Sequence, residues 1–473
     1  MGFPSFLAFT AVILALSQYV PSTSSAPADG TQELILTPLI KSGDLDKARA
    51  AALDSTKLSG VKSDKDVKSF SGYLTIDESK NSNLFFWFFP AQENPETAPV
   101  ILWVNDIPGF TSLKGVFLET GPFFVDDDNK LVERNSTWTR SHSMLYIDAP
   151  VGTGFSFAGS EDAYANSNSD EANEIYEALT QFFILFKEFQ PNDFYIAGEV
   201  FAGTAMPYIA KKIDAENANA AVKVNLKGLI MGAPYLDVLQ IRKEDFYYSL
   251  GLINALQKKE FKENVDKVLA LHEAGKDDEA LNLARTINLG SDSLTARLTG
   301  FTDTHSALTT MNPPEISKFI KFIDSQEVRN YLHTGLHKFV ATNLVVFNHF
   351  SKDAFSKHSE PLMELLDKNY KVLIYVGQFD IYVTPDKLEE VVYNLKWTKS
   401  GDFASAPRKV WRVNGDVAGY TQSAGNFAFA TVRNAGNYAI MDQPEWTTDL
   451  VEKFISVSCR IAWRYDFSQH SCF

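Results

Sequence analysis

Short apolar runs alternate with amphipathic segments along most of the chain from residue 72 onward. Four of these runs are VILWV at 100–104, SMLYI at 143–147, DFYIA at 193–197 and VLIY at 372–375. Uninterrupted apolar runs of this length predict strands that are buried on both faces. Because helical patterns lie between them, we expect an α/β fold with a mostly parallel sheet and helices on both faces.

Helical spacing of apolar residues is clearest in two places. Residues 171–189 predict a helix on the sheet, with Asn168 or Ser169 as its N-cap. Beyond residue 236, Phe261 and Val265 begin a second set of apolar residues at helical spacing, and no convincing strand precedes about residue 325.

These patterns predict the domain organisation. We expect a core in two parts, 69–235 and 326–473, interrupted by a helical cap insertion over 236–325. A polar stretch over 29–68 reads as an N-terminal extension rather than a domain.

The first residues have the layout of a secretory signal peptide. Residues 6–16 form an uncharged apolar run, and small residues occupy 22–26. The run is too short to span a bilayer as a mature helix, although no Lys or Arg precedes it. We expect residues 1–25 to be a signal peptide and the protein to be secreted, with the lysosome or a secretory vesicle as the alternative; no later stretch predicts a membrane span.

Charge and composition exclude several functional classes. The chain has 473 residues and a formal net charge of -15, which disfavours phosphate backbones and anionic lipid surfaces as partners. Its two cysteines, Cys459 and Cys472, are too few for a disulfide scaffold but could pair in an oxidising compartment. Asn135 begins an Asn-Ser-Thr glycosylation sequon.

The segment 193–203 (DFYIAGEVFAG) carries most of the functional information. A predicted strand runs into a turn of small residues and then into a predicted helix over 204–213. This layout is typical of a nucleophile elbow, in which a sharp turn lifts one side chain above the sheet. The central residue of an active elbow is Ser, whereas this chain has Val200.

Longer blocks of sequence resemble the serine carboxypeptidase family, and most closely its vitellogenic carboxypeptidase-like branch. The blocks are NSNLFFWFFPAQ at 81–92, LYIDAPVGTGFSF at 145–157, VLIYVGQFDI at 372–381 and VAGYTQSAGNF at 417–427. The resemblance implies an α/β-hydrolase fold with a helical cap. It also implies an ancestral activity that removes single residues from peptide carboxyl termini at acidic pH.

The resemblance assigns three positions to a Ser-Asp-His triad, in the chain order of α/β-hydrolases. The acid is retained as Asp380, in the GQFD segment. The nucleophile position is Val200, and the histidine position, just ahead of an Asp-Gln-Pro, is Asn437. Since Val has no nucleophilic atom and an amide is not basic, we expect a pseudoenzyme without carboxypeptidase activity.

The oxyanion region departs from the family pattern as well. The family's Gly-rich motif reads Asn-Asp-Ile-Pro-Gly at 105–109, so Asp106 and Ile107 replace glycines. Their side chains add bulk where backbone N–H groups should approach the oxyanion, and Asp106 adds a negative charge. Phe201, after the nucleophile position, could still supply its backbone N–H.

The positions that the resemblance assigns to substrate carboxylate binding are retained. They are Asn105, Glu119 and Glu199. Two close carboxyl groups share a proton, and the protonated one donates a hydrogen bond to a peptide carboxylate. This predicts binding of free peptide carboxyl ends, tighter below about pH 6; the alternative is that both glutamates are structural hydrogen-bonding groups beneath a closed site.

The remaining expectations concern partners and alternatives. No cofactor and no metal site is predicted, and the partners are peptide or protein carboxyl ends, with a homodimer possible. An active serine-type carboxypeptidase and a non-catalytic secreted or storage protein remain alternatives. His333 and His337, four residues apart on an expected helix, and Ser156, in the block at 145–157, are interpreted as structural.

Overall fold

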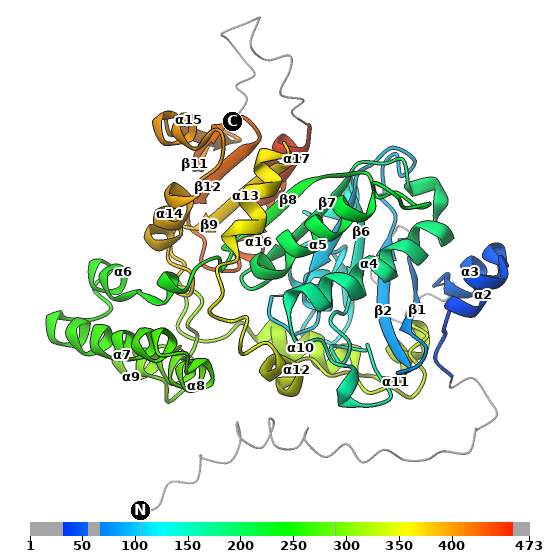
Figure 1. Cartoon of the computed structure of the whole chain (residues 1–473), viewed down its shortest axis with the longest axis horizontal. Coiled ribbons are helices and arrows are strands. Elements are labelled where there is room, and N and C mark those ends of the chain that lie inside the picture. Colours follow the sequence, from blue (N-terminus) through cyan, green and yellow to red (C-terminus); the bar gives the residue numbers. More distant parts are fainter. Residues whose placement is uncertain (1–31, 55–66, 105, 289, 457–473) are drawn as a thin grey trace, which may run out of the picture.

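The computed structural model describes residues 32–54, 67–104, 106–288 and 290–456. The predicted signal peptide, Asn105 and both cysteines lie outside the described residues. Ten strands form one sheet with the order β1-β2-β6-β3-β7-β8-β9-β12-β11-β10 (Figure 1). Its strands are β1 (Phe70–Asp77), β2 (Ser82–Phe89), β3 (Val100–Val104), β6 (Ser143–Ile147), β7 (Phe194–Glu199), β8 (Leu226–Gly232), β9 (Lys371–Gly377), β10 (Lys409–Val413), β11 (Asp416–Ala424) and β12 (Phe427–Val432).

The centre of this sheet is parallel and its two sides are antiparallel. Strands β6, β3, β7, β8, β9 and β12 pair in parallel in that order. The pairs β1–β2, β2–β6, β11–β12 and β10–β11 are antiparallel. The prediction of an α/β fold with a mostly parallel sheet is therefore confirmed.

Helices cover both faces of the sheet because the central strands are apolar on both sides. Leu102 faces a core shared with α4 and α5, whereas its neighbours Ile101 and Trp103 face the opposite core, which includes α10 and α17. The helices on the sheet and at its ends are α4 (Asn168–Leu185), α5 (Ala202–Glu216), α10 (Pro314–Ile323), α11 (Gln326–Tyr331), α12 (Leu344–His349), α13 (Ser359–Asp367), α14 (Pro385–Asn394), α15 (Ser400–Ser405), α16 (Ala439–Asp442) and α17 (Pro444–Ser456).

A separate group of helices projects from the body of the molecule (Figure 1). It consists of α6 (Glu244–Ser249), α7 (Ala255–Glu273), α8 (Asp277–Asn288) and α9 (Leu294–Thr299). Its own small core includes Phe261 and Val265. By contrast, α10 packs against the main body, where the rings of Phe319 and Phe117 stack with their centroids 6.0 Å apart.

The N-terminal segment is part of the folded core. Helices α2 (Thr37–Ser42) and α3 (Leu45–Ala52) bury Leu36, Ile40 and Ala48 in the core that contains α4. Short elements complete the fold. Strand β4 (Phe123–Val125) pairs with β5 (Leu131–Glu133). The short helical segments are η1 (Gly115–Glu119), η2 (Trp138–Arg140), η3 (Glu161–Ala163), η4 (Lys187–Phe189) and η5 (Val238–Ile241).

No helix within the described ranges combines the length and the apolar character that a membrane span requires. His333 and His337 do not share a helix, which corrects the expectation from their spacing. Helix α11 ends at Tyr331, and His333 has a left-handed φ of 57°. Each histidine contacts a carboxylate, His333 that of Asp54 and His337 that of Glu33.

Candidate functional site

The elbow between β7 and α5 retains the sharp geometry of a nucleophile turn. Val200 follows directly after Glu199, the last residue of β7, and α5 begins at Ala202. The turn is held by backbone bonds: Val200 N donates to Gly232 O at 2.9 Å, and Val200 O accepts from Tyr235 N at 2.8 Å. A Cβ at Gly203 would lie 2.4 Å from a side-chain atom of Pro234, so this tight turn requires glycine there.

Val200 is strained in this turn. Its φ is +54°, a left-handed conformation that disfavours β-branched residues and costs of order 1–3 kcal/mol. The side chain is buried, with 4% of the residue exposed. Since an ordinary α or β conformation would relieve the strain, the elbow has not relaxed around Val200.

Asp380 and Asn437, the positions that the resemblance assigns to the acid and the histidine, are hydrogen-bonded to one another. Asn437 Nδ2 donates to Asp380 Oδ2 at 2.8 Å, and the other carboxyl oxygen accepts the backbone N–H groups of Tyr382 and Val383, each at 2.8 Å. Burial raises the pKa of Asp380 to about 7, although these hydrogen bonds oppose the rise. The amide of Asn437 therefore occupies a hydrogen bond to the carboxylate, but an amide cannot accept a proton from a nucleophile.

Lys243 is a titratable group that interacts with Asp380. Its Nζ lies 3.2 Å from Asn288 Oδ1 and 4.4 Å from the centre of the Tyr382 ring. Burial lowers the pKa of Lys243 to about 7, and the charge of Asp380 opposes this shift. Lys243 is therefore a buried amine that interacts electrostatically with the Asp380 carboxyl group.

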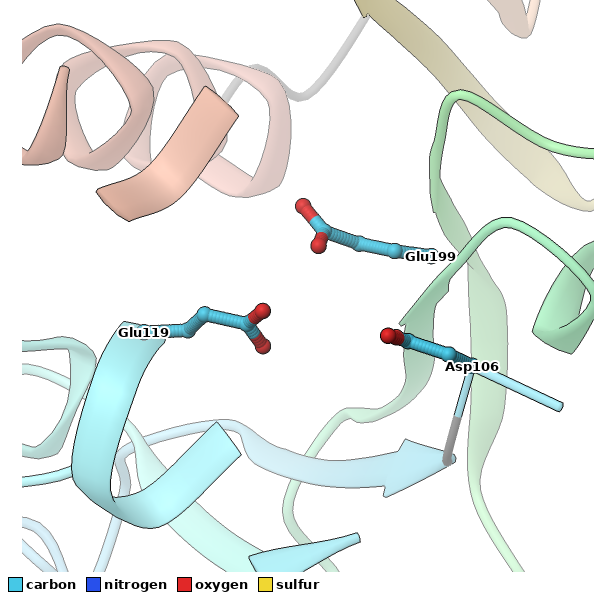
Figure 2. Close-up of side chains that lie close together, drawn as sticks. All are labelled: Asp106, Glu119 and Glu199. Carbon is cyan, nitrogen blue, oxygen red and sulfur yellow. The ribbon is translucent and has the colours of Figure 1, made fainter. Parts of the chain in front are cut away.

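Three carboxyl groups converge beside the elbow. Asp106 follows β3, Glu119 ends η1 and Glu199 ends β7, and Figure 2 shows their side chains pointing toward one another. One carboxyl oxygen from each lies within 4.8 Å of those of the other two. Such a set could ligate a cation, but the Lys114 ammonium already supplies a positive charge there.

Lys114 forms the centre of this cluster. Its Nζ lies 2.5 Å from Asp106 Oδ2 and 2.7 Å from Glu119 Oε1, and it packs 3.9 Å from the centre of the Tyr438 ring. Deeper in the protein, the hydroxyl of Tyr375 donates to Glu199 Oε1 at 3.2 Å. We term Asp106, Lys114, Glu119 and Glu199 the carboxyl cluster.

Within the carboxyl cluster, Glu199 is the carboxyl group most prone to hold a proton. Burial, and then the negative charge of Glu119, raise the pKa of Glu199 well above its usual range. Burial also raises the pKa of Glu119, but the neighbouring Lys114 cation opposes that rise. Glu199 is therefore more prone than Glu119 to be protonated, and Glu119 is the glutamate that pairs with Lys114.

An aromatic stack lies over these groups. The ring of His305 stacks between Tyr382 and Tyr438, with centroid separations of 5.2 and 4.8 Å. His305 Nδ1 lies 2.7 Å from Asp303 Oδ1, and Asn437 N donates to His305 O at 2.9 Å. This segment therefore lies directly against the loop that carries the former histidine position.

The other sequence-predicted residues are placed as follows. Phe201 stacks on Tyr235 at 4.9 Å, and Ile107 is half-buried in the loop after β3. Asn135 is exposed, so its side chain is accessible from solvent. Ser156 is buried, and its hydroxyl donates to Asp148 O and accepts from Phe85 N, as the structural interpretation of this residue requires.

Sequence reasoning missed the two lysines of the site. It also interpreted the Asp106 charge as uncompensated, whereas Lys114 pairs with it. The available signal was a single charged residue within the segment Ser112–Phe117, whose other members are apolar or small. Lys243 gave no such signal, because it lies in a charged stretch between Arg242 and Glu244.

Comparisons with known proteins agree with this fold. A model of the family described as serine carboxypeptidase matches residues 60–457. The venom serine carboxypeptidase of Apis mellifera is 36% identical over 459 residues, covering 95% of this chain and 97% of that protein. The probable serine carboxypeptidase CPVL of Homo sapiens is 37% identical and covers 92% of each chain.

Two further relatives extend the comparison. The vitellogenic carboxypeptidase of Aedes aegypti is 33% identical, covering 90% of this chain and 91% of that protein. The solved structure of Kex1(delta)p, a prohormone-processing carboxypeptidase from Saccharomyces cerevisiae, superposes with a TM-score of 0.74 at 20% identity, covering 86% of this chain and 96% of that one. The chain therefore belongs to the serine carboxypeptidase family.

Proposed function

We propose that this protein is a secreted, catalytically inactive member of the serine carboxypeptidase family that binds peptides by their free carboxyl ends. The observation that carries the loss of activity is the pair of residues at the proposed nucleophile and histidine positions. Val200 occupies the strained elbow position, and the Asn437 amide occupies the bond to Asp380.

The chemistry of acyl transfer requires what these two residues lack. A nucleophile must attack the scissile carbonyl, and a base must take its proton. Losing the nucleophile or the base in a comparable hydrolase lowers turnover roughly a millionfold, and losing both adds little. The names of the relatives include the word carboxypeptidase, but that activity does not transfer to a chain with Val200 and Asn437.

Recognition of a carboxylate needs none of the missing groups. Glu199 is expected to hold a proton that it can donate, and the Lys114 ammonium beside it provides a positive charge. Since a raised carboxyl pKa means loss of that proton at higher pH, binding should weaken as the pH rises through the pKa of Glu199. Asn105, assigned by the family resemblance, completes the proposed set.

The test combines binding with product analysis. The purified secreted protein is titrated calorimetrically with acetyl-Ala-Phe and with its carboxyl amide at pH 5 and pH 7. Each mixture is then examined by mass spectrometry for loss of the terminal residue from longer peptides. We expect binding that requires the free carboxylate and is tighter at pH 5, without any shortened peptide.

Other outcomes would identify the alternatives. Shortened peptide would establish an active carboxypeptidase if its formation persists after repeated purification that removes contaminating proteases. Equal binding of the acid and the amide, or none at either pH, would contradict recognition of carboxyl ends and favour a secreted protein kept for its fold or its surface.

A further inference from the structure

One carboxylate of the carboxyl cluster is more exposed than the others. The Asp106 side chain is 12% exposed, whereas those of Lys114 and Glu119 are 3% and 0% exposed. Asp106 belongs to the loop after β3, outside any helix or strand, while Glu119 belongs to η1. A ligand that enters from solvent therefore meets Asp106 first.

The Lys114 ammonium already has two carboxylates and an aromatic ring around it. Its ammonium pairs with Asp106 Oδ2 at 2.5 Å and with Glu119 Oε1 at 2.7 Å, and the Tyr438 ring lies 3.9 Å away. An ammonium has three N–H donors, so an incoming carboxylate can reach Lys114 only by replacing one of these partners. Of the two carboxylates, Asp106 is the one we expect to move away, because it lies in a loop and is more exposed than Glu119.

We propose that Asp106 is an internal competitor that occupies Lys114 in place of a ligand carboxylate. The ligand's carboxylate binds by displacing the Asp106 side chain and pairing with the Lys114 ammonium, beside Glu199. This inference rests on the proposed recognition of carboxyl ends and adds its regulation: the chain's own carboxylate sets the affinity.

The competition has a predictable direction and size. An attached carboxylate competes at an effective concentration in the millimolar range or above, so its removal should tighten ligand binding about tenfold or more. Removing it also leaves a buried ammonium with one counter-charge fewer, a deficit that a ligand carboxylate restores. Removing Lys114 should instead abolish carboxylate binding.

The experiment compares Asp106→Asn and Lys114→Met with the unmodified full chain. Each protein is titrated calorimetrically with acetyl-Ala-Phe and its carboxyl amide at pH 5, and its folding is checked by a melting curve. Asp127→Asn is the matched control, because Asp127 is 91% exposed and pairs with Lys318 on the surface. We expect Asp106→Asn to bind the free acid about tenfold more tightly than the unmodified chain, and Asp127→Asn to bind it as the unmodified chain does. We expect Lys114→Met not to bind it.

The outcomes distinguish failure of the competitor proposal from failure of the proposed recognition of carboxyl ends. Binding by Asp106→Asn but not by the unmodified chain would support the internal competitor while contradicting recognition by the natural protein. Equal affinity in both would overturn the competitor and leave recognition standing, and no binding by either folded protein would overturn both. If Asp106→Asn fails to fold, Asp106→Gly replaces it; failure of both to fold would make Asp106 a structural residue and overturn the competitor.

Discussion

At the residue scale, the elbow has the backbone conformation of a nucleophile turn, but its central residue, Val200, has no nucleophilic atom. The backbone at Val200 has a φ of +54°, and its N–H and C=O are hydrogen-bonded to Gly232 and Tyr235. The surrounding hydrogen bonds thus determine the backbone conformation of Val200, which is strained because its side chain is β-branched. A glycine at this position would have no such strain but would lose the apolar contacts of the buried Val200.

Replacing Val200 with glycine should therefore cost less stability than the same change at an unstrained site. Val376, fully buried in β9, is the matched control. We expect Val376→Gly to cost about 3 kcal/mol or more, and Val200→Gly to cost about 1–3 kcal/mol less because strain is relieved. Urea unfolding of both variants measures the difference. Equal losses would mean that Val200 is not strained.

At the scale of elements, the cap helices form a unit with its own small core. Phe261 and Tyr247, both fully buried, pack with ring centroids 5.4 Å apart in this core. Tyr247 also donates to Ile381 O at 2.8 Å, which ties the cap to the loop that carries Asp380. A unit with a small core of its own is expected to open without unfolding the sheet.

Phe261→Ala should loosen the cap selectively. Truncating a buried Phe costs about 3–5 kcal/mol, which is large relative to the stability of a small local unit. Hydrogen exchange followed by mass spectrometry should show faster exchange in α6–α9 and little change in β3 and β7. The control is Phe182→Ala on α4 in the main core, which should raise exchange across the sheet. Uniform acceleration by Phe261→Ala would show that cap and sheet unfold together.

At the scale of the whole molecule, many carboxyl groups are buried with raised pKa values. Burial raises the pKa of Asp54 to about 7, and those of Glu171 and Glu174 to about 8. A carboxyl whose folded pKa is raised contributes stability that is present below its unfolded pKa and is lost as the pH rises through the folded value. Asp380, with a pKa of about 7, belongs to the same group.

The protein should therefore become less stable between about pH 6.5 and pH 8. Lys243 has the opposite effect in part of this range, because its pKa is lowered to about 7, but it is one group against several. The histidines with lowered pKa values, such as His142 at about 4, act mainly below pH 6.5. Urea unfolding measured across this range should show stability falling with pH, less steeply in Glu171→Gln. Stability that rises with pH would contradict the expectation.

Local pattern was sufficient where neighbouring residues alone decide the structure. The runs at 100–104 and 143–147 became β3 and β6 with the predicted bounds, because strands in the middle of a sheet are apolar on both faces. Helix α4 begins at Asn168 rather than Glu171, and its N-cap is Ser167, whose side chain accepts from Asp170 N. Several polar residues there are suitable caps, so local sequence did not select among them.

The sequence by itself determined the fold class, the strand-turn-helix elbow and the presence of Val200 at its centre, since motif and residue type suffice for these. The tertiary structure alone decided that Lys114 pairs with Asp106 and Glu119 and lies beneath Tyr438. It also decided that Lys243 lies beside Asp380. Charges in separate loops and strands interact only once the sheet brings those segments together, and burial then sets the strength of the interaction.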